Sequence, residues 1–259
     1  MTPQAVGPML RRWRRERRLS QLELALRAGT STRHLSFVET GRATPSRAML
    51  ARLSEHLDIP LRERDRLLLA AGFAPMHGAP ELDTADMAPI RAVVRRILVA
   101  HEPFPALAVD GDWRMVDANA GVRVFLEGLD PRLLRPPVNA LRLTLHPGGL
   151  APRIANLGQW RGHVLARLAR QITATGSAVL ADLHDELAAY PCEDADEPGP
   201  DTDMPAVPML LRHDGHELAL LSVTSVFGTP RNVTTAELAV ESFFPADAAT
   251  RARLTELVG

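Results

Sequence analysis

The sequence predicts two domains, an all-α N-terminal domain of five helices and an α+β C-terminal domain with an antiparallel sheet. Three observations support this division. Residues 20–45 contain two short helical patterns joined by a glycine turn. Residues 73–88 are rich in Pro, Gly, Ala and Asp without periodicity, which is typical of a linker. Residues 89–259 combine helical periodicity with β-prone runs and hairpin turns. The predicted domains are therefore 1–72 and 89–259, joined by 73–88.

The charge is distributed unevenly along the chain. The 259 residues are 46% apolar and 24% charged with a net charge of −1, an ordinary composition for a protein with a sizeable core. Residues 1–80 hold 14 arginines against 7 acidic residues, whereas residues 81–259 hold 16 against 24. A basic first part and an acidic second part suit a nucleic-acid-binding head on a solvated sensor domain. Every basic residue is arginine, so arginine richness alone says little about phosphate binding.

The single cysteine, Cys192, excludes a disulfide or a thiolate cluster within one chain. The chain shows no apolar N-terminal segment followed by a cleavage site, and no run approaches the roughly 18 apolar residues of a membrane span. We therefore expect a cytoplasmic protein that does not bind membranes.

The stretch 20–29 predicts a short helix and the turn that follows it. Ser20 and Glu23 form a capping box, in which each side chain accepts from a backbone N–H at the start of the helix. Leu22, Ala25 and Leu26 fall at positions i, i+3 and i+4, which predicts one buried stripe. Gly29 stands where the chain must reverse, a position that favours a residue free to adopt positive φ.

A second short helix follows, with Ser31 as its N-cap and Leu35 and Val38 facing inward. Its outward-facing residues are Thr32, Arg33, Ser36 and Phe37. Two helices joined at a steep angle, the second with polar and basic side chains outward, predict a helix-turn-helix.

Three further helices complete the predicted N-terminal domain. The first should bury Leu10 and Trp13 and present the rest of the segment 11–18, RRWRRERR, on its outer face. Its six arginines would either follow DNA phosphates or form a solvated helix face. The fourth helix begins at Ser46, and the fifth covers about 61–71.

Residues 6–72 closely resemble the XRE (Cro/repressor-like) DNA-binding domains. The matching positions are Leu19-Ser20-Gln21, Leu24-Ala25, Ala28-Gly29-Thr30-Ser31, Leu35-Ser36, Val38-Glu39 and Gly41-Arg42-Ala43-Thr44-Pro45-Ser46. The resemblance implies a domain of five helices whose third helix enters the major groove of double-stranded DNA.

The resemblance also implies roles for individual residues. Gln21 would bind a phosphate, Thr32 and Arg33 would face base edges together with Phe37, and Arg42 would contact the backbone. Phe37 departs from the family pattern, because an apolar side chain can only touch a thymine methyl or pack on a sugar. It could equally be a partly exposed core residue. The predicted DNA-binding set is Gln21, Ser31, Thr32, Arg33, Ser36, Phe37 and Arg42.

The C-terminal domain should begin with helices around a β-hairpin. Asp110-Gly111 between β-prone runs is a hairpin signal, and Asn119 opens the helix after the hairpin. Residues 139–145 are either extended or helical. The remaining predicted elements are a helix at 89–101, strands at 106–109 and 113–116, and helices at 151–174 and 177–188.

The end of the chain should supply the rest of the sheet. Residues 190–207 are acidic and rich in proline, which predicts a mobile loop. Three β-prone runs follow, the first two flanking a hairpin turn at 213–216, and a final helix covers 246–257. The runs are 208–213, 217–228 and 234–244. The resulting pattern is an α+β sensor domain of the PAS type with about five strands.

Residues 89–259 resemble the ligand-binding domain of MmyB-like transcription regulators. The matching positions are Pro105-Ala106-Leu107, Asp110, Trp113, Asn119, Asn139, Leu141-Arg142, Trp160, Gly215, Pro245-Ala246-Asp247 and Leu254. The resemblance implies a PAS-like pocket for fatty-acid-like ligands and a homodimer. Its two heads would bind half-sites about 34 Å apart, or a multiple of that, on a near-palindromic operator.

The ligand-site candidates have structural alternatives. Asn119 and Asn139 could bind a polar head group, but could equally cap a helix or a turn. Arg142, Arg153 and Arg161 could pair with a carboxylate, although each could be a surface charge. Apolar candidates, Val223 among them, could line a pocket or fill a core. The predicted ligand-binding set is Phe104, Trp113, Asn119, Phe125, Asn139, Leu141, Arg142 and Trp160.

No pattern in the sequence indicates catalysis or a bound metal. The sequence lacks a nucleophile elbow, a phosphate-binding glycine loop and a spaced acid–base pair. His184, His213 and His216 offer no set of three convergent ligands. We therefore expect a non-enzymatic regulator without a cofactor, apart from an effector ligand. Alternatively, the C-terminal domain is a ligand-free dimerisation or protein-interaction module.

Overall fold

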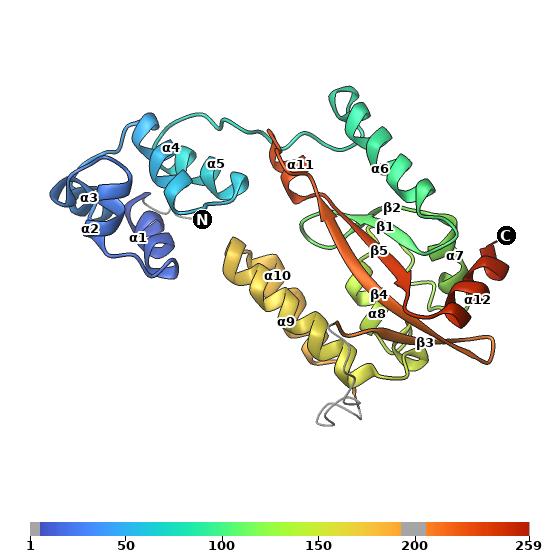
Figure 1. The fold of residues 1–259 in the computed structure, drawn as a ribbon. Coiled ribbons are helices and arrows are strands. Elements are labelled where there is room, and N and C mark those ends of the chain that lie inside the picture. The colour runs from blue at the N-terminus through green and yellow to red at the C-terminus, as the bar shows by residue number, and fades with distance from the viewer. Residues whose placement is uncertain (1–5, 193–205, 259) are drawn as a thin grey trace. The chain divides into compact units, whose positions relative to one another are not determined.

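The computed structural model describes residues 6–192 and 206–258, which divide into two compact units with the boundary at Pro80 (Figure 1). This boundary lies inside the segment 73–88, for which the sequence predicts a linker. Most of the predicted acidic loop, residues 193–205, lies outside the described residues.

The described part of the N-terminal unit contains five helices, as predicted. They are α1 (Val6–Glu16), α2 (Gln21–Arg27), α3 (Thr32–Glu39), α4 (Arg47–His56) and α5 (Leu61–Ala70). The capping box of Ser20 and Glu23 is present, and Ser31 and Ser46 cap α3 and α4 through their side-chain oxygens. Leu10 and Trp13 are fully buried in the core, as expected. Local capping chemistry therefore sets the start of three of these helices.

The predicted buried stripe of α2 is confirmed for Ala25 and wrong for Leu22 and Leu26. Leu24 and Ala25 are buried together with Ala28, whereas Leu22 is 57% exposed and Leu26 is 72% exposed. The sequence offers two apolar faces, because residues 24, 25 and 28 at i, i+1 and i+4 can share one side of a helix just as residues 22, 25 and 26 at i, i+3 and i+4 can. Packing against the other helices of the unit buries the face of α2 that carries Leu24, Ala25 and Ala28.

Two glycines fix the geometry of this unit. Gly29 has φ +60° in the turn between α2 and α3, as the sequence predicts. Gly7 lies where α1 meets the end of α3, and a Cβ there would stand 2.5 Å from the carbonyl oxygen of Val38. Because the obstacle is backbone, it cannot move aside as a side chain would.

We expect Gly7→Ala to lower the free energy of unfolding by about 1–3 kcal/mol, since it forces α1 away from α3. Gly162→Ala is the matched control, because Gly162 lies in a helix of the other unit with open space around its Cβ position. That control should be neutral or stabilise by up to about 1 kcal/mol. Urea denaturation followed by circular dichroism measures both, and equal effects would contradict this account of Gly7.

The first part of the predicted linker is fixed to α5. Asp65 accepts from the backbone N–H groups of Met76 (2.9 Å), His77 (3.2 Å) and Gly78 (3.1 Å), and its Oδ1 also lies 2.9 Å from Nδ1 of His77. Burial alone would raise the pKa of Asp65, but these hydrogen bonds outweigh it and leave that pKa below its ordinary value. Residues 76–78 are therefore held to the N-terminal unit.

The C-terminal unit is an α+β structure, as predicted. Its helices are η1 (Ala85–Met87), α6 (Ala88–Ala100), α7 (Ala120–Leu126), α8 (Ala140–Leu145), η2 (Ala151–Arg153), α9 (Leu157–Thr175), α10 (Ala178–Ala188), α11 (Val233–Glu237) and α12 (Ala248–Val258). Its strands are β1 (Ala106–Val109), β2 (Met115–Ala118), β3 (Met209–His213), β4 (His216–Val226) and β5 (Ala239–Pro245).

The strands of the described residues form one antiparallel five-stranded sheet in the order β2-β1-β5-β4-β3. The predicted hairpin at 213–216 is confirmed: His213 pairs with His216, and Asp214 and Gly215 both have positive φ. Two consecutive positive φ angles match the right-handed twist of the flanking strands.

Helices cover both faces of the sheet (Figure 1). On one face, Val94 and Leu98 of α6 pack on Ala106 and Ala108 of β1 and on Val240 of β5. On the other face, α7 to α10 pack in the larger core. Because β1 is covered on both sides, all four of its residues are buried.

Three predicted elements differ from the structure. The second strand begins at Met115 and not at 113, because Trp113 has φ +64° in the turn. The predicted helix 151–174 is divided: Ile154 is extended and bridges to Leu211 of β3, so α9 begins only at Leu157. The start of the predicted strand 234–244 is helical, because β propensity yields to tertiary context.

Candidate DNA-binding surface and ligand cavity

The outer face of α3 is held in place by its buried face. Leu35 and Val38 are fully buried, so the helix must turn its other side to the solvent. That side carries Arg33 and Phe37. Arg33 is exposed, and its guanidinium lies 5.4 Å from the centre of the Phe37 ring. Phe37 is half-buried, and its ring lies against the Arg33 guanidinium. Of the other predicted readers, Thr32 and Ser36 are half-buried and Ser31 and Arg42 are exposed.

His34 is exposed on the same helix, and the sequence analysis did not include it among the DNA-binding residues. Its backbone N–H donates to the capping oxygen of Ser31 at 3.1 Å, which places it in the first turn of α3. Residues in the first turn of a recognition helix are those that reach base edges. Its position in that turn makes His34 a further candidate DNA-binding residue.

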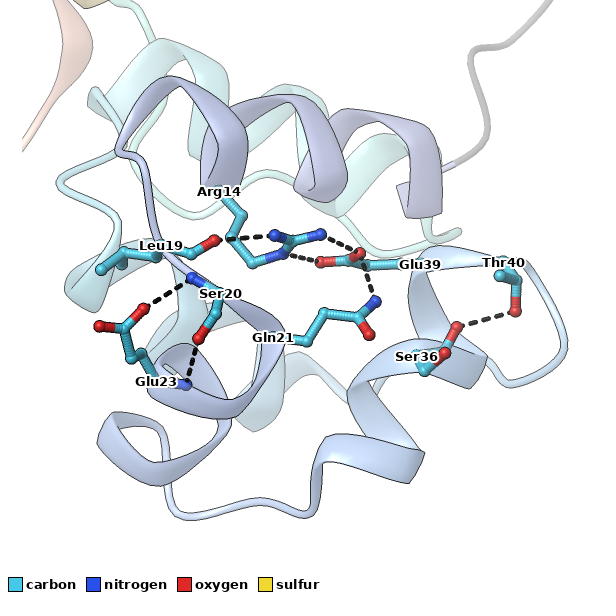
Figure 2. Close-up of polar contacts among 8 residues, drawn as sticks. All are labelled: Arg14, Leu19, Ser20, Gln21, Glu23, Ser36, Glu39 and Thr40. Carbon is cyan, nitrogen blue, oxygen red and sulfur yellow. Dashed lines mark hydrogen bonds and ion pairs between the residues drawn. The ribbon is translucent and has the colours of Figure 1, made fainter.

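A buried ion pair joins α1 to the end of α3 (Figure 2). Nε and Nη2 of Arg14 donate to the two carboxylate oxygens of Glu39 at 2.6 and 2.8 Å, and Nη1 donates to the carbonyl of Leu19 at 2.8 Å. Both side chains are largely shielded from water, with 11% and 1% exposure. The expected position of Arg14 on the outer face of its helix is therefore wrong, because Glu39 supplies a buried counter-charge.

Gln21 joins this network at the start of α2. Its Nε2 donates to Oε2 of Glu39 at 2.8 Å, so the side chain is oriented by the same carboxylate that holds Arg14 (Figure 2). An amide nitrogen carries two hydrogens, so one remains for a phosphate oxygen. The ion pair thus positions the residue expected to bind the DNA backbone.

Two carboxyl groups of the N-terminal unit, Glu39 and Asp65, make its stability depend on pH in the acid range. Burial alone would raise the pKa of Glu39, but the hydrogen bonds from Arg14 and Gln21 hold it below its ordinary value of 4.5. The pKa of Asp65 is also below its ordinary value of 3.8. A depressed carboxyl pKa means that the folded state binds the proton more weakly than the unfolded state does.

The stability contributed by both groups should be fully present above about pH 4.5 and should be lost as the pH falls through their folded-state pKa values. Urea denaturation between pH 7 and 3 measures this, followed by tryptophan fluorescence in a Trp113→Phe, Trp160→Phe background that leaves Trp13 as the reporter. Glu39→Gln, which removes one of the titrating groups, should give a shallower acid slope. The same slope in both proteins would contradict the assignment.

The arginines of α1 do not form one continuous phosphate-facing stripe. Besides Arg14, Arg17 is used internally, donating from Nε to the carbonyl of Leu57 at 2.9 Å. Arg12 lies 3.6 Å from Glu16 in an exposed pair. The exposed members of the set are Arg11, Arg12, Arg15 and Arg18.

A cavity of about 100 Å³ lies in the C-terminal unit, between one face of the sheet and helices α7, α8 and α9. All five strands contribute to its largely apolar lining. Four residues of the predicted ligand-binding set line it: Trp113, Phe125, Leu141 and Trp160.

Asn119 lies outside this lining and is fully buried. Its Nδ2 donates to the carbonyls of Leu98 and Phe104, and its Oδ1 accepts from the N–H groups of Ala106 and Val122. Two donor hydrogens and two acceptor lone pairs are thereby used by backbone groups. Asn119 caps α7, which is the structural alternative considered above.

The three other predicted ligand residues also lie outside the cavity lining. Asn139 caps α8, accepting from two backbone N–H groups at its start. Arg142 makes a bidentate pair with Glu186 at 2.7 and 2.6 Å. Phe104 packs at the edge of the core, 5.6 Å from the guanidinium of Arg251 in α12.

Three further candidates are also placed elsewhere. Arg153 donates to the carbonyl of Phe125 and Arg161 to a carbonyl at the end of α10, so neither lines the cavity. Val223 is 48% exposed on the opposite face of the sheet. Since side chains alternate along a strand, its neighbour Ser222 faces the cavity instead.

The sequence analysis missed the polar end of the cavity. Arg167 of α9 donates from Nη1 and Nη2 to the carboxylate of Glu241 in β5, at 3.0 and 2.5 Å. Ser222 donates to the same carboxylate at 3.0 Å, and the guanidinium lies 4.5 Å from the centre of the Trp113 ring. A lone acidic residue within the apolar run VESFF of β5 was the available signal.

The family comparisons assign both units. Residues 10–64 match the helix-turn-helix family, and residues 90–257 match the family described as the MmyB-like transcription regulator ligand binding domain. The chain belongs to the MmyB-like transcription regulators. No curated protein matches it. The chain is therefore a DNA-binding transcription regulator with an XRE-type helix-turn-helix domain and a ligand-sensing domain.

Both families are transcription-regulator domains. Within residues 6–192 and 206–258, this MmyB-like regulator has no group of three His, Cys, Asp or Glu side chains placed to hold a metal ion. Over the same residues, no helix has the length and apolar character needed to cross a membrane.

Proposed function

We propose that this MmyB-like regulator binds an operator through α3 and that a small amphipathic molecule in the cavity, a fatty acid or another acyl compound, controls this binding. The supporting observation is the cavity itself: an apolar lining with a polar end, in the same chain as a helix-turn-helix. To change operator occupancy, the ligand must bind the two states with affinities that differ by about 1–3 kcal/mol.

In this proposal residues 1–72 form the DNA-binding domain, 73–88 the linker and 89–259 the sensor. The exposed side of α3 reads base edges and the start of α2 positions a phosphate. The residues assigned to DNA are Gln21, Ser31, Thr32, Arg33, Ser36, Phe37 and Arg42, with His34 added from the structure.

The regulator would act as a homodimer on a near-palindromic operator. Exposed apolar side chains support a dimer interface on the α6 side of the C-terminal unit. Val93 and Ile97 of α6, Val223 of β4 and Phe244 of β5 are 38–48% exposed. Sedimentation of the full chain at twice its mass of 28.3 kDa is the expected result. A species at the mass of one chain, at micromolar concentration, would contradict the dimer.

Organic extraction of the purified protein, followed by mass spectrometry, tests the sensor function. A stoichiometric acyl compound in the extract is the expected result. An empty extract, together with no thermal stabilisation by a panel of acyl compounds, would contradict ligand sensing.

The alternative function is a ligand-free dimerisation or interaction module. The size of the cavity favours it, because about 100 Å³ is less than the roughly 150 Å³ of a cavity that binds benzene. In that case the extract is empty and operator affinity does not change with any acyl compound.

A further inference from the structure

The charged end of the cavity is already neutral without a ligand. Arg167 meets Glu241 through two hydrogen bonds and also donates to Thr224 at 2.7 Å. Glu241 is only 4% exposed and accepts a further bond from Ser222. The guanidinium that could attract an anionic head group therefore carries its own carboxylate partner.

A second observation concerns Trp160, whose side chain lines the cavity while its indole nitrogen is buried. Trp160 is 5% exposed, and its indole N–H has no hydrogen-bond partner among the residues that the structure describes. A buried donor without an acceptor costs about 1–3 kcal/mol. Because this nitrogen is shielded from the cavity as well, Trp160 serves as a reporter of what occupies the cavity and not as its donor.

We propose that the cavity selects an uncharged amphiphile, such as an alcohol, an ester or an amide, and disfavours an ionised fatty acid, with Glu241 as the specificity-determining residue. This inference rests on the proposed ligand-sensing function and specifies the class of ligand.

The charge balance around the cavity supports this choice. An ionised carboxylate would enter beside Glu241, a like charge, and would find Arg167 already paired. His163 supplies no replacement cation, because burial, and then the nearby Arg167 and Arg170, lower its pKa and keep the ring neutral at pH 7. An uncharged oxygen avoids both the repulsion and the desolvation of an unpaired charge.

The size of the cavity limits the tail. If roughly 150 Å³ holds the six carbons of benzene, about 100 Å³ holds about four non-hydrogen atoms before the lining must move. Short chains are therefore suitable probes, a six-carbon chain entering with some movement of the lining, and a matched pair of equal chain length isolates the effect of the head group.

The test compares 1-hexanol with hexanoate at pH 7.5, using the indole N–H resonances of the three tryptophans in the full chain. Hexanol should shift the resonance of Trp160, with that of Trp13 in the N-terminal unit as an internal control. It should bind at least about tenfold more tightly than hexanoate, the ratio that corresponds to about 1.4 kcal/mol. Trp160→Phe assigns the resonance by removing it.

Glu241→Gln should remove the preference, because it frees the Arg167 guanidinium for an anion. We expect the affinity for hexanoate to rise at least about tenfold, with less than about threefold change for hexanol. Glu186→Gln is the matched control, since it frees Arg142 outside the cavity lining and should leave the preference unchanged.

Hexanoate binding to the wild-type protein as tightly as hexanol would overturn this inference and leave ligand sensing intact. An unchanged preference in a folded Glu241→Gln protein would overturn the role of Glu241. No shift of Trp160 with either probe would overturn the inference, and the proposed function as well if the organic extract is also empty. The wild-type comparison needs no variant to fold.

Discussion

Glu39→Ala should lower the free energy of unfolding of the N-terminal unit by about 3–5 kcal/mol. In this variant the Arg14 side chain is still only 11% exposed but has lost its carboxylate partner. The folded state is destabilised because a positive charge is then buried without a counter-charge. The loss of Glu39 also frees Gln21 from the position it needs at the start of α2. Urea denaturation followed by Trp13 fluorescence, in the Trp113→Phe, Trp160→Phe background, measures the effect.

Glu16→Ala is the matched control, because Glu16 pairs with Arg12 on the same helix but at the surface. An exposed pair is worth about 0–1 kcal/mol, so the control should change little. Replacing both buried partners, in Arg14→Met with Glu39→Leu, should recover most of the lost stability, since no charge is then left unpaired. A loss below about 1 kcal/mol in Glu39→Ala would contradict the account of the buried pair.

Local chemistry explains which parts of the N-terminal unit could be predicted. Ser20, Ser31 and Ser46 act within three residues of their partners, so their capping roles can be seen in the sequence alone. The burial of Leu24 in place of Leu22 depends on how α2 packs, which the spacing of apolar residues does not decide. The ion pair of Arg14 joins residues 25 positions apart, and nothing local indicates it.

The same distinction holds in the C-terminal unit. The sheet and the hairpin at 213–216 follow from alternation and turn residues, and the family comparison confirms the ligand-binding domain. Whether Trp113 and Trp160 line a cavity or fill a core depends on a fit of side chains from all five strands and three helices. Arg167 and Glu241 lie 74 residues apart, so their pairing depends on the register of β5 against α9.

Arg33→Ala should abolish the preference for the operator over random DNA, a loss of about 1–3 kcal/mol at each half-site. Arg33 is exposed on the outward face of α3, where a guanidinium can bind the edge of a guanine. Gln21→Ala should instead weaken binding to operator and random DNA by similar factors, because a phosphate contact carries no sequence information.

Selection from a random DNA library supplies the operator, and fluorescence anisotropy at two salt concentrations measures the affinities. Arg96→Ala is the control, an exposed arginine on α6 of the sensor domain that should change neither affinity. Normal operator binding by both Arg33→Ala and Gln21→Ala would contradict the assignment of α3 to the major groove. We expect Arg33→Ala to lose the preference for the operator but to keep salt-dependent binding to DNA. Salt dependence comes from phosphate contacts, which release counterions, so this result would show that Arg33 recognises bases and does not supply the phosphate contacts.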